Sequence, residues 1–454
     1  MKFALGVMKN YSTNSFRLET VSADTASGGR VVTVNLPQNA LLDMKSFRWF
    51  FHVKCSGNTD AGLAPADTVH SKLPADIQSL ISRVEVYING IQVQQGSAEY
   101  NSIYKLLKLN RGNQGKDQSI DRAIQNGQIS TVSTVSDDKD VAVLDWAGVL
   151  NETSTRFLPT DLLGNIQVRI TLAGNEVLVP LQNNQTIGAV FTNANAASNA
   201  TKIKYEISDM YFTINSITVD SMYNAMLREK IQRDSYIPIN YLEYYSFSLD
   251  SINASAATTR FSLSSQSINK IYASLRDGNY GAAGIPGKQL PIDHVGDAYV
   301  ANYFRFRNFN VGATANYRSQ HSLNNVKYPQ FLQSPLGNLC NISYSADKVG
   351  MSSLGTLISS FDGFQDGQFC ATLRLNHPSG LCQTRGEDLS IMSGYDSRSV
   401  NTMATYETQG MVIPPAQPNT AQPNSSAGTA SCFVVVETLA TLRCGLGGQL
   451  ATIF

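Results

Sequence analysis

The feature that most limits the fold of this chain is an alternation of apolar and polar residues that recurs along its length. In Ile166–Leu172 every second residue is Ile, Val or Leu, and the residues between them are Gln, Arg and Thr. A period of two is typical of a strand with one buried face, because successive side chains of a strand point to opposite sides. The alternation therefore predicts an all-β protein whose sheets each have an apolar face to cover.

Similar patterns predict strands in both halves of the chain, with a boundary at 233–238. In the first half the expected strands are 30–36, 44–55, 81–88, 141–146, 155–159, 166–172 and 205–219. In the second half they are 241–249, 260–264, 268–275, 303–311, 369–375 and 433–443. Each half is therefore expected to form a β-sandwich, because an apolar sheet face must pack against another.

The stretch 81–109 combines a predicted hairpin with a predicted short helix. Asn89-Gly90 indicates a two-residue hairpin turn, because both residues tolerate positive φ. Ser97 can cap the N-terminus of the helix. Its apolar face is expected to consist of Tyr100, Ile103, Tyr104 and Leu107. Glu99 in the first turn, and Lys105 and Lys108 toward the C-terminal end, have the charges that the helix dipole favours. Further short helices are expected after Met222 and at 352–360.

Length and charge favour a protein that associates with other proteins. The 454 residues suggest two or three domains, and the 35 basic and 35 acidic residues cancel. A neutral chain has no long-range attraction to nucleic acid or to an anionic membrane, and its copies repel one another weakly. No window approaches 18 apolar residues, so no transmembrane segment is expected, and the first apolar run is too short for a signal peptide.

The six cysteines show no metal-binding or redox pattern. They lack a C-x-x-C pair and regular spacing, and they are Cys55, Cys340, Cys370, Cys382, Cys432 and Cys444. The interpretation is reduced, mostly buried thiols in an intracellular product.

The sequence contains no complete motif for catalysis, cofactor binding or metal binding. The glycines at 278–288 lack two requirements of a phosphate-binding loop, because Ala282 replaces a glycine and Gln289 follows the lysine. The histidines, His52, His70, His294, His321 and His377, have no zinc-ligand spacing. Asp293, His294 and His321 lack a nucleophile elbow for a serine triad, and Glu387 and Asp388 would face opposite sides of a strand.

One stretch combines basic and aromatic residues as single-stranded nucleic-acid binders do. Arg305 and Arg307 alternate with Phe304 and Phe306, so the arginines are expected on one face of a half-buried strand and the rings on the other. We therefore interpret the stretch as an ordinary strand, and predict no sequence-specific nucleic-acid binding.

The order of the strand motifs resembles that of the double jelly-roll major capsid proteins. The motifs are RVEVYINGIQV, YNSIYKLLKL, RFLPTDLLGNIQVRITLAGNEVL and YEISDMYFTINSITVDSMYNAML, then SINKIYASLRD, NYFRFRNF and LNNVKYPQF. These motifs cover most of residues 30–380. They are most similar to the capsid proteins of polinton-like viruses and virophages, which are small viruses with double-stranded DNA genomes.

This resemblance implies two tandem eight-stranded jelly rolls with short helices in loops. The expected parts are an N-terminal arm at 1–28, which the polar sequence also allows as a leading strand, a first jelly roll at 29–235, a second at 236–444 and a C-terminal tail at 445–454. Three copies would form a pseudo-hexagonal capsomer that tiles an icosahedral shell in the virion and contacts penton and minor capsid proteins. The segments 110–140, 183–201, 278–295 and 411–431 are expected to form outward loops or trimer contacts. The family has no enzymatic activity and no cofactor.

A secreted carbohydrate-binding or carbohydrate-cleaving β-sandwich protein is the alternative. It would need an export signal, disulfides and tryptophan platforms on its surface, whereas Trp49 and Trp146 lie within apolar runs. A bacterial or archaeal viral capsid protein of the same fold is a nearer alternative, which changes the host and leaves the function intact.

Overall fold

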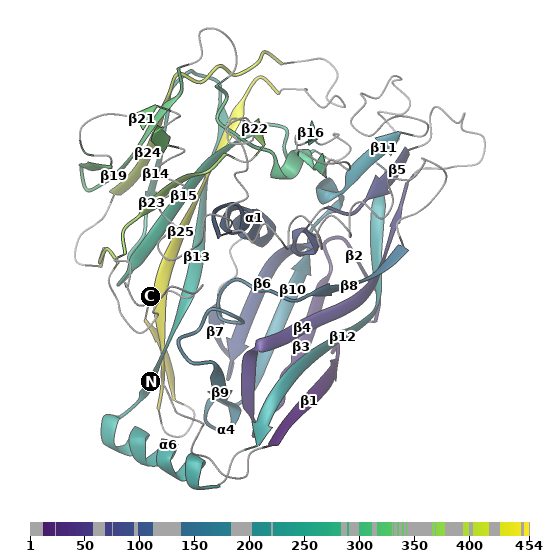
Figure 1. Ribbon diagram of the computed structural model, residues 1–454, viewed down its shortest axis with the longest axis vertical. Helices are drawn as coiled ribbons and strands as arrows, with labels where there is room; N and C mark the ends of the chain where they lie inside the picture. The colour runs from purple at the N-terminus through teal and green to yellow at the C-terminus, as the bar shows by residue number, and fades with distance from the viewer. Residues whose placement is uncertain are drawn as a thin grey trace.

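The structure of the protein is a computed structural model (Figure 1). Most of the residues that it describes lie in two β-rich regions. The described residues are 12–22, 24–57, 69–74, 76–94, 99–111, 138–182, 202–218, 221–282, 288–289, 299–310, 316–328, 330, 334–335, 338–339, 342, 366–367, 369–376, 394–398, 403–416, 427–445 and 449–453.

The first β-rich region is a jelly roll of two antiparallel sheets. One sheet has the order β1 (Ser12–Glu19), β12 (Lys204–Thr218), β4 (Leu41–Ser56) and β8 (Asp138–Val143). The other has the order β3 (Val31–Asn35), β10 (Ile166–Leu172), β6 (Ile81–Ile88) and β7 (Ile91–Gln94). Numbered along the chain, strands 1, 8, 3 and 6 form one sheet and strands 2, 7, 4 and 5 form the other. This is the strand order of an eight-stranded jelly roll.

The second region repeats this order. Its first sheet contains β13 (Ile237–Ile252), β25 (Ala430–Cys444), β15 (Ile268–Asp277) and β23 (Ala371–Arg374), paired in that sequence. Its second sheet contains β14 (Ala257–Ser262), β24 (Met403–Gln409), β19 (Arg318–Leu323) and β20 (Val326–Tyr328). The prediction of two tandem eight-stranded jelly rolls is thus confirmed strand by strand.

Shorter strands complete the sheets. In the first jelly roll β2 (Ala26–Ser27) pairs with β12, β9 (Phe157–Pro159) pairs with β4, and β5 (Val69–Lys72) pairs with β11 (Val179–Gln182). In the second, β18 (Phe306–Arg307) joins β15 to β22 (Asp366–Gly367), and β21 (Ser334–Pro335) pairs with β19. β16 (Lys288–Gln289) pairs with β17 (Tyr299–Val300), and β26 (Leu450–Ile453) with β25.

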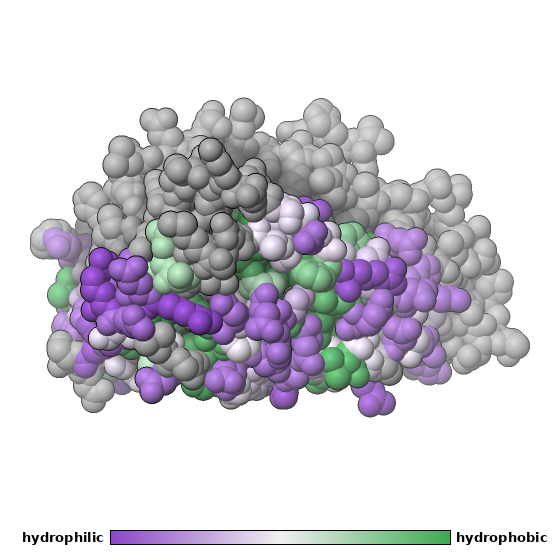
Figure 2. Space-filling model, turned by 90° about the horizontal axis from the view of Figure 1, so that it is seen from below, coloured by the Kyte–Doolittle hydropathy of each residue, from purple (hydrophilic) through white to green (hydrophobic). Residues whose placement is uncertain are grey.

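The described helices lie in the connections between strands. They are α1 (Tyr100–Arg111), α4 (Thr160–Leu163) and α6 (Ser221–Asp234), with 3₁₀ turns η3 (Ile77–Leu80), η5 (Asn175–Val177) and η6 (Asn302–Phe304). α6 links the jelly rolls at the lower end of Figure 1, where Leu227 and Ile231 pack against Leu41 and Ile237. Viewed from that end, hydrophilic residues separate small apolar areas on the described surface (Figure 2). Among the helices that the structure describes, none has the length and apolar character needed to cross a bilayer.

The larger apolar core continues from the first jelly roll onto the second. It joins the interior of the first jelly roll to one face of the β13–β25–β15 sheet, including Tyr272, Phe433 and Val435. The other face of that sheet covers the second jelly roll's own core, with Val434 and Val436. Every residue of β15 is consequently buried.

The structure decides between the two readings of the N-terminal segment. Residues 1–28 were expected as an arm or a leading strand, and β1, which pairs with β12 over eight register positions, is the first strand of the first jelly roll. The sequence STNSFRLE lacks apolar alternation because almost every side chain of β1 is exposed. The tail predicted at 445–454 contains β26, which pairs with β25.

Other boundaries differ more locally. The strand predicted at 303–311 is instead the turn η6 followed by the two-residue strand β18. α6 is longer than the one or two turns expected after Met222. The hairpin turn is confirmed, because Asn89 and Gly90 both have positive φ between β6 and β7. The helix predicted at 352–360 lies outside the described residues, as do most of the expected outward loops.

Candidate functional site: the junction between the jelly rolls

Helix α1 lies between the two jelly rolls (Figure 1) and begins the region that joins them. Its buried side chains, Tyr100, Ile103, Leu106 and Leu107, belong to the shared core, as the spacing of apolar residues in the sequence indicates. The Tyr100 hydroxyl accepts a hydrogen bond from the backbone N–H of Ala147 at 2.8 Å, and burial raises the pKa of Tyr100. The helix is therefore anchored on its first-jelly-roll side by packing and by a buried hydrogen bond.

The lysines of α1 bind a buried carboxylate. Asp76, which precedes η3, is 2% exposed and forms ion pairs with Lys105, at 2.7 Å, and with Lys108. Burial alone would raise the pKa of Asp76, but the two ammonium groups outweigh it and hold this pKa well below its usual range. The two lysines, expected from the sequence to favour the C-terminal end of the helix dipole, therefore fix α1 against η3.

The opposite side of α1 meets the second jelly roll through Arg276, a fully buried residue of β15. Its guanidinium donates hydrogen bonds from Nη2 to Glu99 Oε2 at 2.8 Å and from Nη1 to Ser102 Oγ at 3.1 Å. The guanidinium carbon also lies 3.8 Å from the ring centre of Tyr280 and 4.5 Å from that of Phe433. A buried cation needs such partners, because desolvation without them is costly.

Glu99 corrects the prediction for the start of α1. It was expected inside the first helical turn, but it precedes the helix with φ of +68°. Its carboxylate instead accepts hydrogen bonds from Arg276 and, at 3.3 Å, from the Tyr280 hydroxyl. Ser97, the predicted cap, lies outside the described residues.

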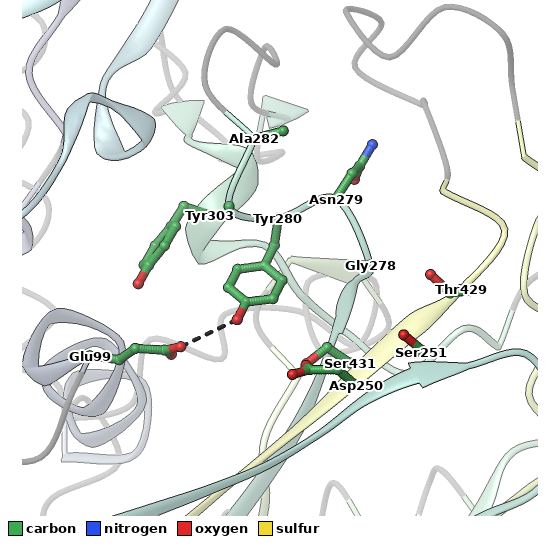
Figure 3. Close-up of a pocket in the computed structure, with 11 residues that line it drawn as sticks. Glu99, Asp250, Ser251, Gly278, Asn279, Tyr280, Ala282, Tyr303, Thr429 and Ser431 are labelled. Atoms are coloured by element: carbon green, nitrogen blue, oxygen red, sulfur yellow. Dashed lines mark hydrogen bonds between the residues drawn. The ribbon is translucent and has the colours of Figure 1, made fainter.

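A polar pocket of about 480 Å³ lies beside this cluster (Figure 3). Glu99 enters it from the position just before α1, Tyr280 and Tyr303 from the second jelly roll, and Asp250 and Ser431 from β13 and β25. The Ser431 hydroxyl donates a hydrogen bond to Asp250, and Tyr280 donates to Glu99. The carboxylates are therefore used in internal contacts, and the described residues of the lining include no histidine or cysteine that could act as a nucleophile or base.

A second buried ion pair continues the network into the second jelly roll. Arg307 donates to Asp277 at 3.3 Å, and its guanidinium carbon lies 4.6 Å from the ring centre of Phe309. Asp277 also accepts a hydrogen bond from the backbone N–H of Ala427 at 3.0 Å. Arg305 and Arg307 were expected on the exposed face of a strand, but they are only 4% and 6% exposed, so the stretch is buried on all sides.

Further hydrogen bonds cross the junction below α1. The Tyr241 hydroxyl donates to the Val93 carbonyl at 2.9 Å, and the Tyr244 hydroxyl donates to Glu152 at 2.7 Å. Backbone bonds run from the Ser154 N–H to the Asn240 carbonyl at 2.7 Å and from the Leu242 N–H to the Glu152 carbonyl at 3.0 Å. The two jelly rolls are therefore joined by buried packing and by hydrogen bonds, and they form one unit.

The remaining candidate residues do not converge on a site. His52 Nδ1 lies 3.0 Å from Asp140 Oδ1 on the first jelly roll, whereas His321 is buried in the second, where burial lowers its pKa to about 4. Gly278 and Gly281 lie in the turn after β15. Asp293, His294, His377, Glu387, Asp388 and the His70 side chain lie outside the described residues. Within the described part of the chain, no three His, Cys, Asp or Glu residues are grouped as metal ligands.

The prediction of mostly buried, unpaired thiols is confirmed for the cysteines that the structure describes. Cys55, Cys370, Cys432 and Cys444 are buried free thiols, and burial raises the pKa of Cys432 to about 12. Cys340 and Cys382 lie outside the described residues.

Sequence reasoning missed Arg276 and Glu99 as the centre of the junction. The predicted strand stopped at Leu275, one residue before Arg276. The signal was present nevertheless, because Lys270, Tyr272, Ser274 and Arg276 alternate with apolar residues that face the other side. Their burial could not be read from the sequence, since polar residues at every second position indicate an exposed face.

Comparison with known proteins identifies the fold. No family model and no curated protein matches the sequence. Among solved structures, the quasi-atomic model of the PBCV-1 virus capsid is 13% identical, with 98% of this chain and 97% of that chain covered and a TM-score of 0.58. The Faustovirus major capsid protein is 9% identical, with 96% and 91% covered and a TM-score of 0.55.

A third similar structure comes from a virophage. A chain of the Sputnik virophage, solved by cryo-electron microscopy, is 12% identical, with 98% of this chain and 88% of that chain covered and a TM-score of 0.51. The likeness extends over both jelly rolls in all three comparisons. The chain therefore has the double jelly-roll fold of viral major capsid proteins.

Proposed function

We propose that this chain is the major capsid protein of a double-stranded DNA virus, of the type found in polinton-like viruses and virophages. The observation that carries the proposal is that both jelly rolls and their junction together match viral capsid chains over 96–98% of the sequence. An assembly role needs a rigid unit with outward faces, and the shared core and the buried ion pairs across the junction provide one. The function is structural, with no catalytic step and no cofactor.

The proposed assembly is a homotrimer with a pseudo-hexagonal outline. Two similar barrels held rigidly side by side supply two of six corners, so three copies complete the ring. Neighbouring capsomers, with penton and minor capsid proteins, would then close an icosahedral shell, and the protein would reside in the virion capsid. A formal net charge of +0 suits this role, because large obligate interfaces disfavour unpaired charge.

The carbohydrate-binding alternative receives no support from the tryptophans. Trp49 is 0% exposed and Trp146 is 3% exposed, and the Trp146 indole donates a hydrogen bond to the Phe47 carbonyl at 3.1 Å. These are the two tryptophans of the chain, so neither supplies the exposed aromatic platform that sugar rings stack on.

Electron microscopy of the purified protein tests the proposal. Negatively stained particles should give class averages with six lobes and three-fold symmetry, and shells should form at high protein concentration. Class averages that show only isolated two-lobed particles at every concentration would contradict it. Glycan-array binding is the matching measurement for the alternative.

A further inference from the structure

The polar pocket at the junction combines buried inner side chains with an exposed rim (Figure 3). Tyr303 and Ser431 line it and are only 8% and 1% exposed, whereas Asp250, Gly278 and Ala282 line it and are exposed. Its volume of about 480 Å³ is within the range of about 300–1,000 Å³ that is usual for pockets that bind small molecules. The pocket can therefore admit a small ligand from solvent.

A bulge in β13 brings two polar residues to this pocket. The register of β13 with β25 shifts between Leu249 and Ile252, and Ser251 within this bulge has φ of +61°. This left-handed conformation is unfavourable for residues other than glycine, and bulges often reorient side chains beside functional sites. Asp250 and Ser251, the two residues inside the bulge, both line the pocket.

Three hydrogen-bonding groups in the lining have no partner among the described residues. They are the Oδ2 atom of Asp250 and the hydroxyls of Ser251 and Thr429. The Ser431 hydroxyl donates to Asp250 Oδ1, which leaves Oδ2 available. A carboxylate oxygen accepts hydrogen bonds, whereas a hydroxyl both donates and accepts them. The pocket therefore offers one charged acceptor and two adaptable groups to a ligand.

The rim of the pocket is held in place before any ligand binds. The Gly278 N–H donates to the Thr429 carbonyl at 2.9 Å, and the Ala282 N–H donates to the Asn279 carbonyl at 3.0 Å. A Cβ atom at Gly278 would collide with the Thr429 hydroxyl, so these two segments lie in close contact. A rim that is already ordered reduces the entropy cost of binding.

The charges around the pocket disfavour an anionic ligand. The described lining contains two carboxylates, Glu99 and Asp250, and includes no lysine, arginine or histidine. Arg276, from outside the lining, forms an ion pair with Glu99. A phosphate, sulfate or carboxylate ligand would therefore meet Asp250 without a compensating cation.

The aromatic group of the rim disfavours an organic cation. Tyr280 is partly exposed, and its ring centre already lies 3.8 Å from the guanidinium carbon of Arg276. A second cation against this ring would be repelled by the first. The ring instead suits the apolar C–H groups of a neutral ligand.

We propose that this pocket binds a neutral saccharide. Hydroxyls of a sugar ring would donate to Asp250 Oδ2 and exchange hydrogen bonds with Ser251 and Thr429, while a C–H face of the ring packs on Tyr280. The rim belongs to the segments 278–295 and 411–431, and as outward loops these would open the pocket toward glycans of a host surface. That placement, unlike the binding itself, rests on the proposed function.

Saturation-transfer NMR tests the binding with a panel of neutral sugars, namely glucose, galactose, mannose and their disaccharides. The wild-type protein should bind a member of this panel with a dissociation constant on the order of 1 mM. Asp250→Asn should weaken binding at least about tenfold, because it removes a charge-assisted acceptor. The matched control is Asp24→Asn, which changes an exposed aspartate of the first jelly roll outside the lining and should bind as the wild type does.

A second variant, Thr429→Val, applies even if Asp250→Asn does not fold. It preserves the size of the side chain and removes a hydroxyl that has no partner among the described residues, so it should leave the melting temperature unchanged. Saccharide binding should weaken about two- to tenfold. Circular dichroism, thermal melting and light scattering report the fold and the mass of each variant.

The inference would be overturned if no neutral saccharide of the panel binds at millimolar concentration, or if a folded Asp250→Asn or Thr429→Val variant binds as the wild type does. It would also be overturned if Asp24→Asn weakens binding equally, or if spermidine, an organic cation, displaces the saccharide. A trimer that binds no saccharide would contradict this inference alone. A monomer that binds one would contradict the proposed function and favour the carbohydrate-binding alternative, so the two failures are distinguishable.

Discussion

Replacing Arg276 with methionine should weaken the junction between the jelly rolls. The change keeps a long apolar side chain near Tyr280 and Phe433, but it removes the guanidinium and its hydrogen bonds to Glu99 and Ser102. The hydrogen bond to the Glu99 carboxylate is worth about 1.5–3 kcal/mol, and the ring contacts about 0.5–2 kcal/mol. Relief of guanidinium burial offsets part of this sum, so we expect a net loss of about 2–4 kcal/mol in the free energy of unfolding.

Changing the partner residue, Glu99→Gln, should lower the free energy of unfolding by at least as much as Arg276→Met. It leaves Arg276, whose side chain is 0% exposed, with its charge buried and unpaired, whereas Glu99 is 24% exposed and can be hydrated when Arg276 is absent. The double variant should therefore lose less than the sum of the single variants, with a coupling energy of about 1–3 kcal/mol.

Urea unfolding of the four proteins at one fixed protein concentration measures this cycle, because association would make stability depend on concentration. Arg276→Met should also separate the unfolding transitions of the two jelly rolls, since it removes a contact between them. Additive effects, or a loss below about 0.5 kcal/mol for Arg276→Met, would refute the assignment of this cluster as the link.

Three further results are expected from buried groups. Burial lowers the pKa of His321 to about 4, so the folded state favours neutral His321 and the free energy of unfolding falls as pH drops from about 6.5 toward 4. At pH 5 the loss is about 2 kcal/mol. His321→Phe should therefore flatten the dependence of the melting temperature on pH over this range. Asp76→Asn removes the partner of two lysines and should cost about 3–5 kcal/mol at neutral pH in thermal unfolding. Because the pKa of Asp76 is lowered in the fold, its contribution is complete above about pH 4 and decreases as pH falls below this value, so the difference between variant and wild type should narrow progressively in acid. Cys432 and Cys444, both with pKa raised to about 12 by burial, should resist alkylation in the native protein and react after denaturation, and rapid native labelling of either would contradict their burial.

Strands with one buried face could be located from the sequence, because apolar alternation reports burial on one side. β10 is the clearest example, and its bounds match the predicted 166–172. For β1 the sequence left an arm and a leading strand as alternatives, because nearly all of its side chains are exposed and its place in the sheet depends on backbone pairing with β12. Backbone pairing leaves no mark on the pattern of apolar residues.

The junction could not be predicted because it depends on contacts between residues far apart in the chain. Arg276 and Glu99 are separated by 177 positions, and nothing local in either segment distinguishes a buried arginine from a solvated one. The stretch around Arg305 and Arg307 was misjudged for the same reason, since its alternation suggested one exposed face while the fold buries both. Polar residues in a strand report exposure only when no second barrel covers them.

The native mass of the wild-type protein, measured by light scattering after gel filtration over a range of dilutions, tests the capsid account most directly. The account predicts a mass near 148 kDa, three times the 49.4 kDa of one chain, that persists on dilution. A stable species near 49 kDa at all concentrations would contradict the trimeric capsomer.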